Sequence, residues 1–191
     1  MFGKRWLWLA AGLAAMTVAG CSEGVNLNIF SPGYFSAKKP PPPPPCPRLA
    51  LAEFADRLRR FDGEIRVSEK MLFDAEILQA DGQCRYRDDD TVIDMEMTVR
   101  IGVALGPAAP EKQAPIRYFV AIARNGDHSV VARGAFDTTV EFPGITRHSG
   151  TTEEFEQTIP LKPGETGADY VILLGFEMTP EELAYNRENP N

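Results

Sequence analysis

The chain is short of positive charge. Its 191 residues carry 20 Lys and Arg against 27 Asp and Glu, which gives a formal net charge of −7. Binding to nucleic acid depends on a basic surface that neutralises phosphates. We therefore expect no nucleic-acid partner. The length allows one ordinary globular domain with short appendages.

The sequence also lacks the motifs that mark a reaction centre. It holds no phosphate-binding loop, no dinucleotide-binding fingerprint and no Gly-x-Ser-x-Gly elbow. Its two histidines, His128 and His148, stand outside any zinc-ligand spacing, and both are expected in loops. We therefore expect no catalytic residue and no cofactor.

The densest acidic cluster is Asp88-Asp89-Asp90, with Asp94 four residues later. Oxygen ligands of this kind suit Ca²⁺. The cluster lacks the spaced acids and the terminal glutamate of an EF-hand, so we predict a solvent-exposed turn between strands and no metal site. The alternative is that these acids act with a histidine in a metal-dependent or small-molecule enzyme.

No apolar run reaches the length of about 20 residues that a membrane-spanning helix needs. The stretch from Leu7 to Gly20 is apolar but shorter, and Lys4 and Arg5 precede it, a layout typical of an export signal. The segment Val18-Ala19-Gly20-Cys21 resembles the lipobox of bacterial lipoproteins. The resemblance implies a signal peptide over residues 1–20, cleavage before Cys21 and acylation of that thiol, with palmitate as a typical acyl group. The alternative is a soluble secreted protein.

Residues 21–45 are interpreted as a tether. They combine turn-forming residues with the run Pro40 to Pro45, which favours a stiff polyproline spacer. Residue 22 is serine, a pattern that resembles lipoproteins released to the outer membrane of Gram-negative envelopes. We therefore expect an envelope protein that faces the periplasm, with an outer-membrane anchor preferred over the inner membrane.

Residues 46–191 predict a mainly β domain. Every odd position from Ile93 to Leu105 is apolar, which indicates a half-buried strand. Asp81-Gly82 and Asn125-Gly126 predict turns between strands. We expect an antiparallel two-sheet sandwich, immunoglobulin-like in type, with a small barrel as the alternative. The other strands are expected at Met71 to Gln79, Gln83 to Arg87, Arg117 to Arg124, Ser129 to Asp137, Thr138 to Phe142, Glu153 to Leu161 and Tyr170 to Phe176.

Two helices are expected to flank the strands. Apolar residues recur at helical spacing between Pro47 and Gly63, which predicts an N-terminal helix. They are Leu51, Phe54, Ala55, Leu58 and Phe61. The segment Thr179 to Glu182 predicts a capping box, and a short C-terminal helix should follow through about Arg187.

Cysteine is scarce, with three residues in the chain. If Cys21 is acylated, Cys46 and Cys84 remain. Because an exported protein reaches an oxidising compartment, we predict one disulfide between them. The alternative is two buried free thiols.

The segment Gly175 to Arg187, together with Cys46-Pro47-Arg48, resembles uncharacterised alphaproteobacterial envelope lipoproteins. The resemblance implies a family but no activity, and no functional residue comes with it. The segment places Leu183, Tyr185 and Arg187 on the terminal helix. We interpret it as closing one end of the sandwich, and a partner-binding edge is the alternative.

Three functions are compatible with these features. The first is a lipid-anchored, non-catalytic binding or scaffolding domain with an envelope protein as its partner. The second is a small-molecule or metal-dependent periplasmic enzyme, for example a hydrolase. The third is an envelope assembly factor or chaperone that offers an open sheet edge to client strands.

Overall fold

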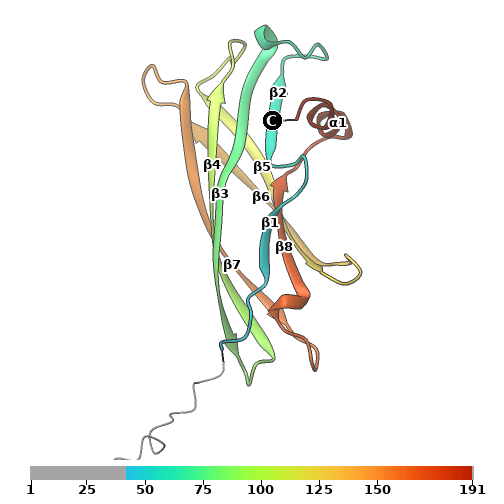
Figure 1. Ribbon diagram of the computed structural model, residues 1–191. Helices are drawn as coiled ribbons and strands as arrows, with labels where there is room; N and C mark the ends of the chain where they lie inside the picture. Colours follow the sequence, from blue (N-terminus) through green and yellow to red (C-terminus); the bar gives the residue numbers. More distant parts are fainter. Residues whose placement is uncertain (1–41, 191) are drawn as a thin grey trace, which may run out of the picture. The chain divides into compact units, whose positions relative to one another are not determined.

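The computed structural model describes residues 42–190, which form two packed β-sheets and a short C-terminal α-helix (Figure 1). The strands are β1 (Arg48–Leu51), β2 (Arg57–Phe61), β3 (Met71–Arg87), β4 (Val92–Leu105), β5 (Gln113–Arg124), β6 (Val130–Glu141), β7 (His148–Pro160) and β8 (Tyr170–Phe176), and the helix is α1 (Pro180–Glu188). Within this part of the chain, no helix is long and apolar enough to cross a membrane.

The strand order is β1-β8-β5-β6 in one sheet and β2-β3-β4-β7 in the other. Neighbouring strands are antiparallel, except that β1 runs parallel to β8. The expected antiparallel two-sheet sandwich is therefore confirmed. The odd positions of β4, from Ile93 to Leu105, are buried between the sheets as their alternation predicts.

The two ends of the sandwich are built from different segments (Figure 1). One end, which we call the base, holds the β3–β4 turn, the β5–β6 turn and the β7–β8 loop. It also holds Cys46, where the chain enters the sandwich. We call the far end the opposite end, which holds the β2–β3, β4–β5 and β6–β7 loops together with α1. The base contains the candidate site.

The prediction of an N-terminal helix between Pro47 and Gly63 is wrong. Arg48–Leu51 is strand β1 and pairs with β8, whereas Arg57–Phe61 is strand β2 and pairs with β3. Between them Phe54 has a φ of 61°, which a right-handed helix does not allow. Hydrogen bonding to two different sheets has therefore overridden a short helical pattern.

The turn expected at Asp81-Gly82 is also wrong, because both residues lie inside the 17-residue strand β3. Gly82 pairs with Met97, and a Cβ atom on it would lie 3.2 Å from Cε of Met95. The glycine therefore makes room for two methionine side chains and does not reverse the chain. Similarly, the two strands expected between Ser129 and Phe142 are one strand, β6.

Local signals at other turns and at the C-terminus are confirmed. Asn125-Gly126 lies in the turn of the β5–β6 hairpin. In α1 the Thr179 side chain accepts a hydrogen bond from the Glu182 N–H, the Glu182 carboxylate accepts one from the Thr179 N–H, and Pro180 occupies the first helical position. These features depend on neighbouring residues only, so the sequence can predict them.

Candidate functional site at the base of the sandwich

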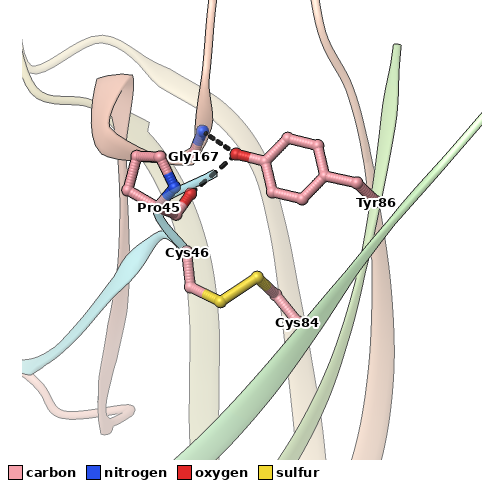
Figure 2. Close-up of a disulfide and its surroundings, with 5 residues drawn as sticks. All are labelled: Pro45, Cys46, Cys84, Tyr86 and Gly167. Atoms are coloured by element: carbon pink, nitrogen blue, oxygen red, sulfur yellow. Dashed lines mark hydrogen bonds between the residues drawn. A yellow bond between two sulfur atoms is a disulfide. The ribbon is translucent and has the colours of Figure 1, made fainter. Parts of the chain in front are cut away.

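A disulfide joins the two sheets at the point where the chain enters the sandwich (Figure 2). It links Cys46, two residues before β1, to Cys84 in β3, across 38 positions of sequence and with 5.7 Å between the two Cα atoms. The predicted pairing is confirmed. The bond ties the start of the shortest strand to the longest strand, which belongs to the other sheet.

The Tyr86 hydroxyl connects three segments beside this disulfide (Figure 2). It donates a hydrogen bond to the carbonyl oxygen of Pro45 at 2.6 Å and accepts one from the N–H of Gly167 at 2.7 Å. A Cβ atom on Gly167 would lie only 2.3 Å from the Pro45 oxygen, so the backbones meet where no larger residue fits. We call Pro45, Cys46, Cys84, Tyr86 and Gly167 the N-terminal junction.

A second network, centred on Glu165, fixes the loop that carries Gly167. The Tyr170 hydroxyl and the Lys162 N–H donate to its carboxylate at 2.6 and 2.9 Å, and Arg124 forms an ion pair with it. These donors, led by Tyr170, lower the pKa of Glu165 to about 2. Burial and the Glu165 charge raise the pKa of Tyr170 in turn. At neutral pH Glu165 is therefore a carboxylate anion that holds three chain segments together.

Asn125 connects the β5–β6 turn to the same loop. Its side-chain amide donates to the Ala168 carbonyl oxygen at 2.5 Å, and its N–H donates to the Asp169 carbonyl oxygen at 2.9 Å. The base is thus tied by a covalent bond and by contacts between otherwise separate loops. Such an arrangement can hold an N-terminal segment firmly.

The acidic cluster forms the β3–β4 turn, as predicted. Asp88, Asp89 and Asp90 are exposed and all adopt positive φ angles. Arg87 pairs with both Asp94 and Asp88, and its hydrogen bond lowers the pKa of Asp94. Among the described residues, no group of three or more His, Cys, Asp and Glu side chains is arranged to hold a metal ion.

The two histidines do not share one location. His128 is exposed in the β5–β6 turn with a φ of 57°. His148 was expected in a loop, but it is the first residue of β7. It lies at the far end. The 13 residues of β7 span about 40 Å, which separates His148 from the base. The structure therefore does not bring His148 together with the acidic turn that the enzyme hypothesis needs.

Two of the three residues singled out on the terminal helix, Tyr185 and Arg187, lie against β2 and the segments on either side of it. Tyr185 packs edge-on against Phe61 with 5.5 Å between ring centroids, and the Arg66 guanidinium lies 5.1 Å from the Tyr185 ring. Arg187 lies 5.9 Å from the Phe54 ring, and Leu183 is half-buried. Their contacts fit the role of closing one end of the sandwich, and partner binding by them stays a prediction.

Asn186 is a structural residue that the sequence reasoning missed. Its side chain is buried, and Nδ2 donates to the carbonyl oxygens of Phe54 at 2.9 Å and of Arg57 at 2.6 Å. These bonds hold α1 against the start of β2. Most residues of α1 are polar, so nothing in the sequence distinguishes Asn186 from its neighbours before the partner carbonyls are known.

The sequence reasoning also missed an acidic hollow of about 400 Å³ on the outer face of the β2-β3-β4-β7 sheet. Its carboxylates are Asp81, Glu96, Glu154 and Glu156, and Glu96 pairs directly with Glu156 in the β4–β7 register. They come from three strands, so strand register alone brings them together. A like-charge pair of this kind costs stability.

The expected lipidation site Cys21, the expected signal peptide over residues 1–20 and the expected tether as far as residue 41 lie outside the described residues. A scan against protein-family models found no match to the chain. Searches of curated proteins and of solved structures also found no match. Any function must therefore be argued from the residues themselves.

Proposed function

We propose that this chain is a lipid-anchored protein of the bacterial cell envelope, attached to the membrane through Cys21 after removal of residues 1–20. Its β-sandwich is a non-catalytic binding or scaffolding domain that faces the periplasm, with the outer membrane as the preferred site of anchoring. The partner is another envelope protein.

The observation that carries this proposal is the disulfide between Cys46 and Cys84. Structural disulfides persist in oxidising compartments and are rare in the cytosol, which supports export. The bond also uses two of the three cysteines in the chain. Cys21 is therefore the one thiol left for acylation, and it stands where the lipobox resemblance expects it.

The position of the N-terminal junction supports a tethered arrangement. The chain enters the sandwich at the base, so an anchored domain is held by the end that carries the disulfide and the hydrogen bonds of Tyr86 and Glu165. Two or three acyl chains bind a bilayer firmly, because each buried methylene contributes about 0.8 kcal/mol. A tether of this kind restricts the domain to partners close to a membrane.

Metabolic labelling with an alkyne fatty acid tests the anchor. The full-length chain should take up label and partition into detergent, and Cys21→Ser should lose both properties. A double variant with Cys46→Ser and Cys84→Ser is the matched control, and it should keep the label. An unlabelled wild-type chain in the soluble fraction, or a label that survives Cys21→Ser, would contradict the proposal.

Crosslinking in intact envelopes tests the scaffolding role. A specific protein should be recovered with the wild-type chain at a level well above that seen with Cys21→Ser. If the two recover the same proteins, the binding role is wrong even where the lipid anchor is right.

The assembly-factor hypothesis is a second candidate, and one observation favours it. In the described chain β6 and β7 are long strands that pair on one side only. An open edge of this type can accept a strand from another chain. The two edges differ in the residues that they offer.

A further inference from the structure

The sandwich has four edge strands, and two of them are short or covered. β1 has four residues and β2 has five, and α1 packs beside β2. β6 has 12 residues and β7 has 13, and each pairs on one side only within the described chain. Long open edges of this type are where another strand can add.

The register shows which backbone groups of β6 point outward from the sheet edge. The Arg117 carbonyl oxygen accepts a hydrogen bond from the N–H of Glu177, which follows β8, so odd residues of β5 face β8 and even residues face β6. Because Val120 pairs with Gly134, the even residues of β6 face β5. The odd residues, from Val131 to Glu141, therefore turn their N–H and C=O groups toward the open side.

β7 carries devices that oppose pairing with a second copy of itself. Glu153 points into the sandwich, where the Thr138 and Thr151 hydroxyls donate to it at 2.9 and 2.8 Å. Inward charges of this kind protect edges. An antiparallel β7 pair centred at any position from 153 to 156 would place glutamate opposite glutamate, because Glu153, Glu154 and Glu156 all lie there.

β6 has the opposite character. It contains no proline and no lysine, and its pairing with β5 is regular except near Val130. An antiparallel pair centred on Ala135 places Arg133 of one copy opposite Asp137 of the other, and does so twice. The same register places Gly134 opposite Phe136 on the inner face. Opposite charges in directly opposed cross-strand positions stabilise a sheet.

Both charged residues are accessible on the outer face, with 45% of the Arg133 side chain and 72% of the Asp137 side chain exposed. Within the chain Arg133 pairs with Glu177 at 2.6 Å, and Asp137 lies 3.5 Å from Arg117. A guanidinium has five donors, so Glu177 does not exhaust Arg133. A carboxylate from a second copy can therefore join this charge network.

We propose that two copies of the chain associate through β6, antiparallel and centred on Ala135. The product is a continuous eight-stranded sheet with two-fold symmetry, closed by about ten new backbone hydrogen bonds. Each copy covers the unprotected edge of the other. The inference rests on the sheet register and does not require the lipid anchor.

Cysteine crosslinking tests the register in the full-length chain, purified in detergent and treated with a mild oxidant. Ala135→Cys should give a disulfide-linked dimer, because directly opposed residues have Cα atoms about 5.5 Å apart, within disulfide range. Thr139→Cys is the matched control on the same edge. It should not crosslink, because position 139 of one copy would lie about 27 Å from position 139 of the other. The wild-type chain sets the background from Cys21.

Adding Val131→Cys to Thr139→Cys should restore crosslinking, because these two positions oppose each other in the proposed register. Equal crosslinking of the two single variants would mean random collision and would overturn the proposal. No dimer from Ala135→Cys would overturn it as well.

A charge exchange tests the association itself by sedimentation equilibrium of the full-length chain in detergent. Arg133→Asp or Asp137→Arg alone should weaken the dimer by about tenfold, because each creates two like-charge pairs. Both changes together should restore association, which also shows that the variants fold. Arg85→Asp, an equal charge change on the other sheet, should have no effect.

A wild-type chain that stays monomeric over the accessible concentration range would overturn the proposal. If β6 then bound a strand from another envelope protein, the edge would serve the assembly-factor function. Loss of dimer with Arg85→Asp but not with the β6 variants would place the interface on the other sheet and would also overturn the proposal.

Discussion

The base and the far end of the sandwich are held by different means. At the base a disulfide, the Tyr86 hydroxyl and the Glu165 carboxylate join strands of both sheets to the segment before β1 and to the β7–β8 loop. At the far end α1 is held by the buried Asn186 amide and by partly exposed ring and cation contacts. The far-end loops also expose Ile65 and Ile145, which are 66% and 97% exposed. The disulfide, the one covalent cross-link of the described residues, therefore lies where the N-terminal segment enters.

Of the changes that test this difference between the two ends, removal of the disulfide should have the largest effect on stability. Cys46→Ser with Cys84→Ser should lower the free energy of unfolding by about 4 kcal/mol, because the unfolded chain loses a closed loop. Urea denaturation monitored by circular dichroism measures the change. Wild-type protein under reducing conditions should shift to the same midpoint, and an unchanged midpoint in the double variant would contradict the role of the junction.

A methyl group at the close backbone contact should have the next largest effect. Gly167→Ala places a Cβ against the Pro45 oxygen and should cost about 1–3 kcal/mol, since the two backbones must separate. Gly126→Ala is the matched control in another base turn, where no atom lies within 4 Å of the added carbon. Equal unfolding midpoints for the two variants would show that the contact contributes nothing.

A change at the far end should act more locally. Asn186→Ala removes the donor to the Phe54 and Arg57 carbonyl oxygens and should weaken α1 docking by about 1–2 kcal/mol. Hydrogen exchange should become faster in α1 and β2 and should stay unchanged around Cys84. Faster exchange at the base would mean that the two ends are coupled and would contradict the view that they are held independently.

The smallest expected effect is a pH dependence of stability that comes from the Glu165 network. Its folded pKa of about 2 lies below its ordinary value of 4.5, so its stabilising contribution is complete above pH 4.5 and disappears as the pH falls toward 2. The difference in unfolding midpoint between wild type and Glu165→Gln should therefore shrink over this window. A midpoint difference that stays constant from about pH 5 to about pH 2 would contradict the role of Glu165.

Local features were predictable from the sequence, whereas features set by long-range pairing were not. The α1 capping box and the Asn125-Gly126 hairpin depend on residues a few positions apart. The disulfide followed from the scarcity of cysteine. In contrast, Phe54 and Leu58 have helical spacing, but Leu58 is buried by pairing with Ala75, 17 positions away. No local pattern encodes that choice.

The candidate site shows the same limit. The Asp88 turn was predicted correctly, because three consecutive acids before a strand favour a solvent-exposed turn. The Tyr86–Gly167 hydrogen bond and the Glu165–Arg124 ion pair join residues 81 and 41 positions apart. Asp81 and Glu154 meet in the acidic hollow only through the registers of β3, β4 and β7. These contacts required the folded sheets.

The disulfide also decides where tension on the N-terminus would go. β1 has four residues and is the first element that a pulling force would otherwise reach. Because Cys46 precedes β1 and is bonded to Cys84, such a force passes directly into β3, whose 17 residues pair with both β2 and β4. The shortest strand is thus bypassed. A force on the tether would act on β3, an inner strand of the β2-β3-β4-β7 sheet, and would leave β1 without load.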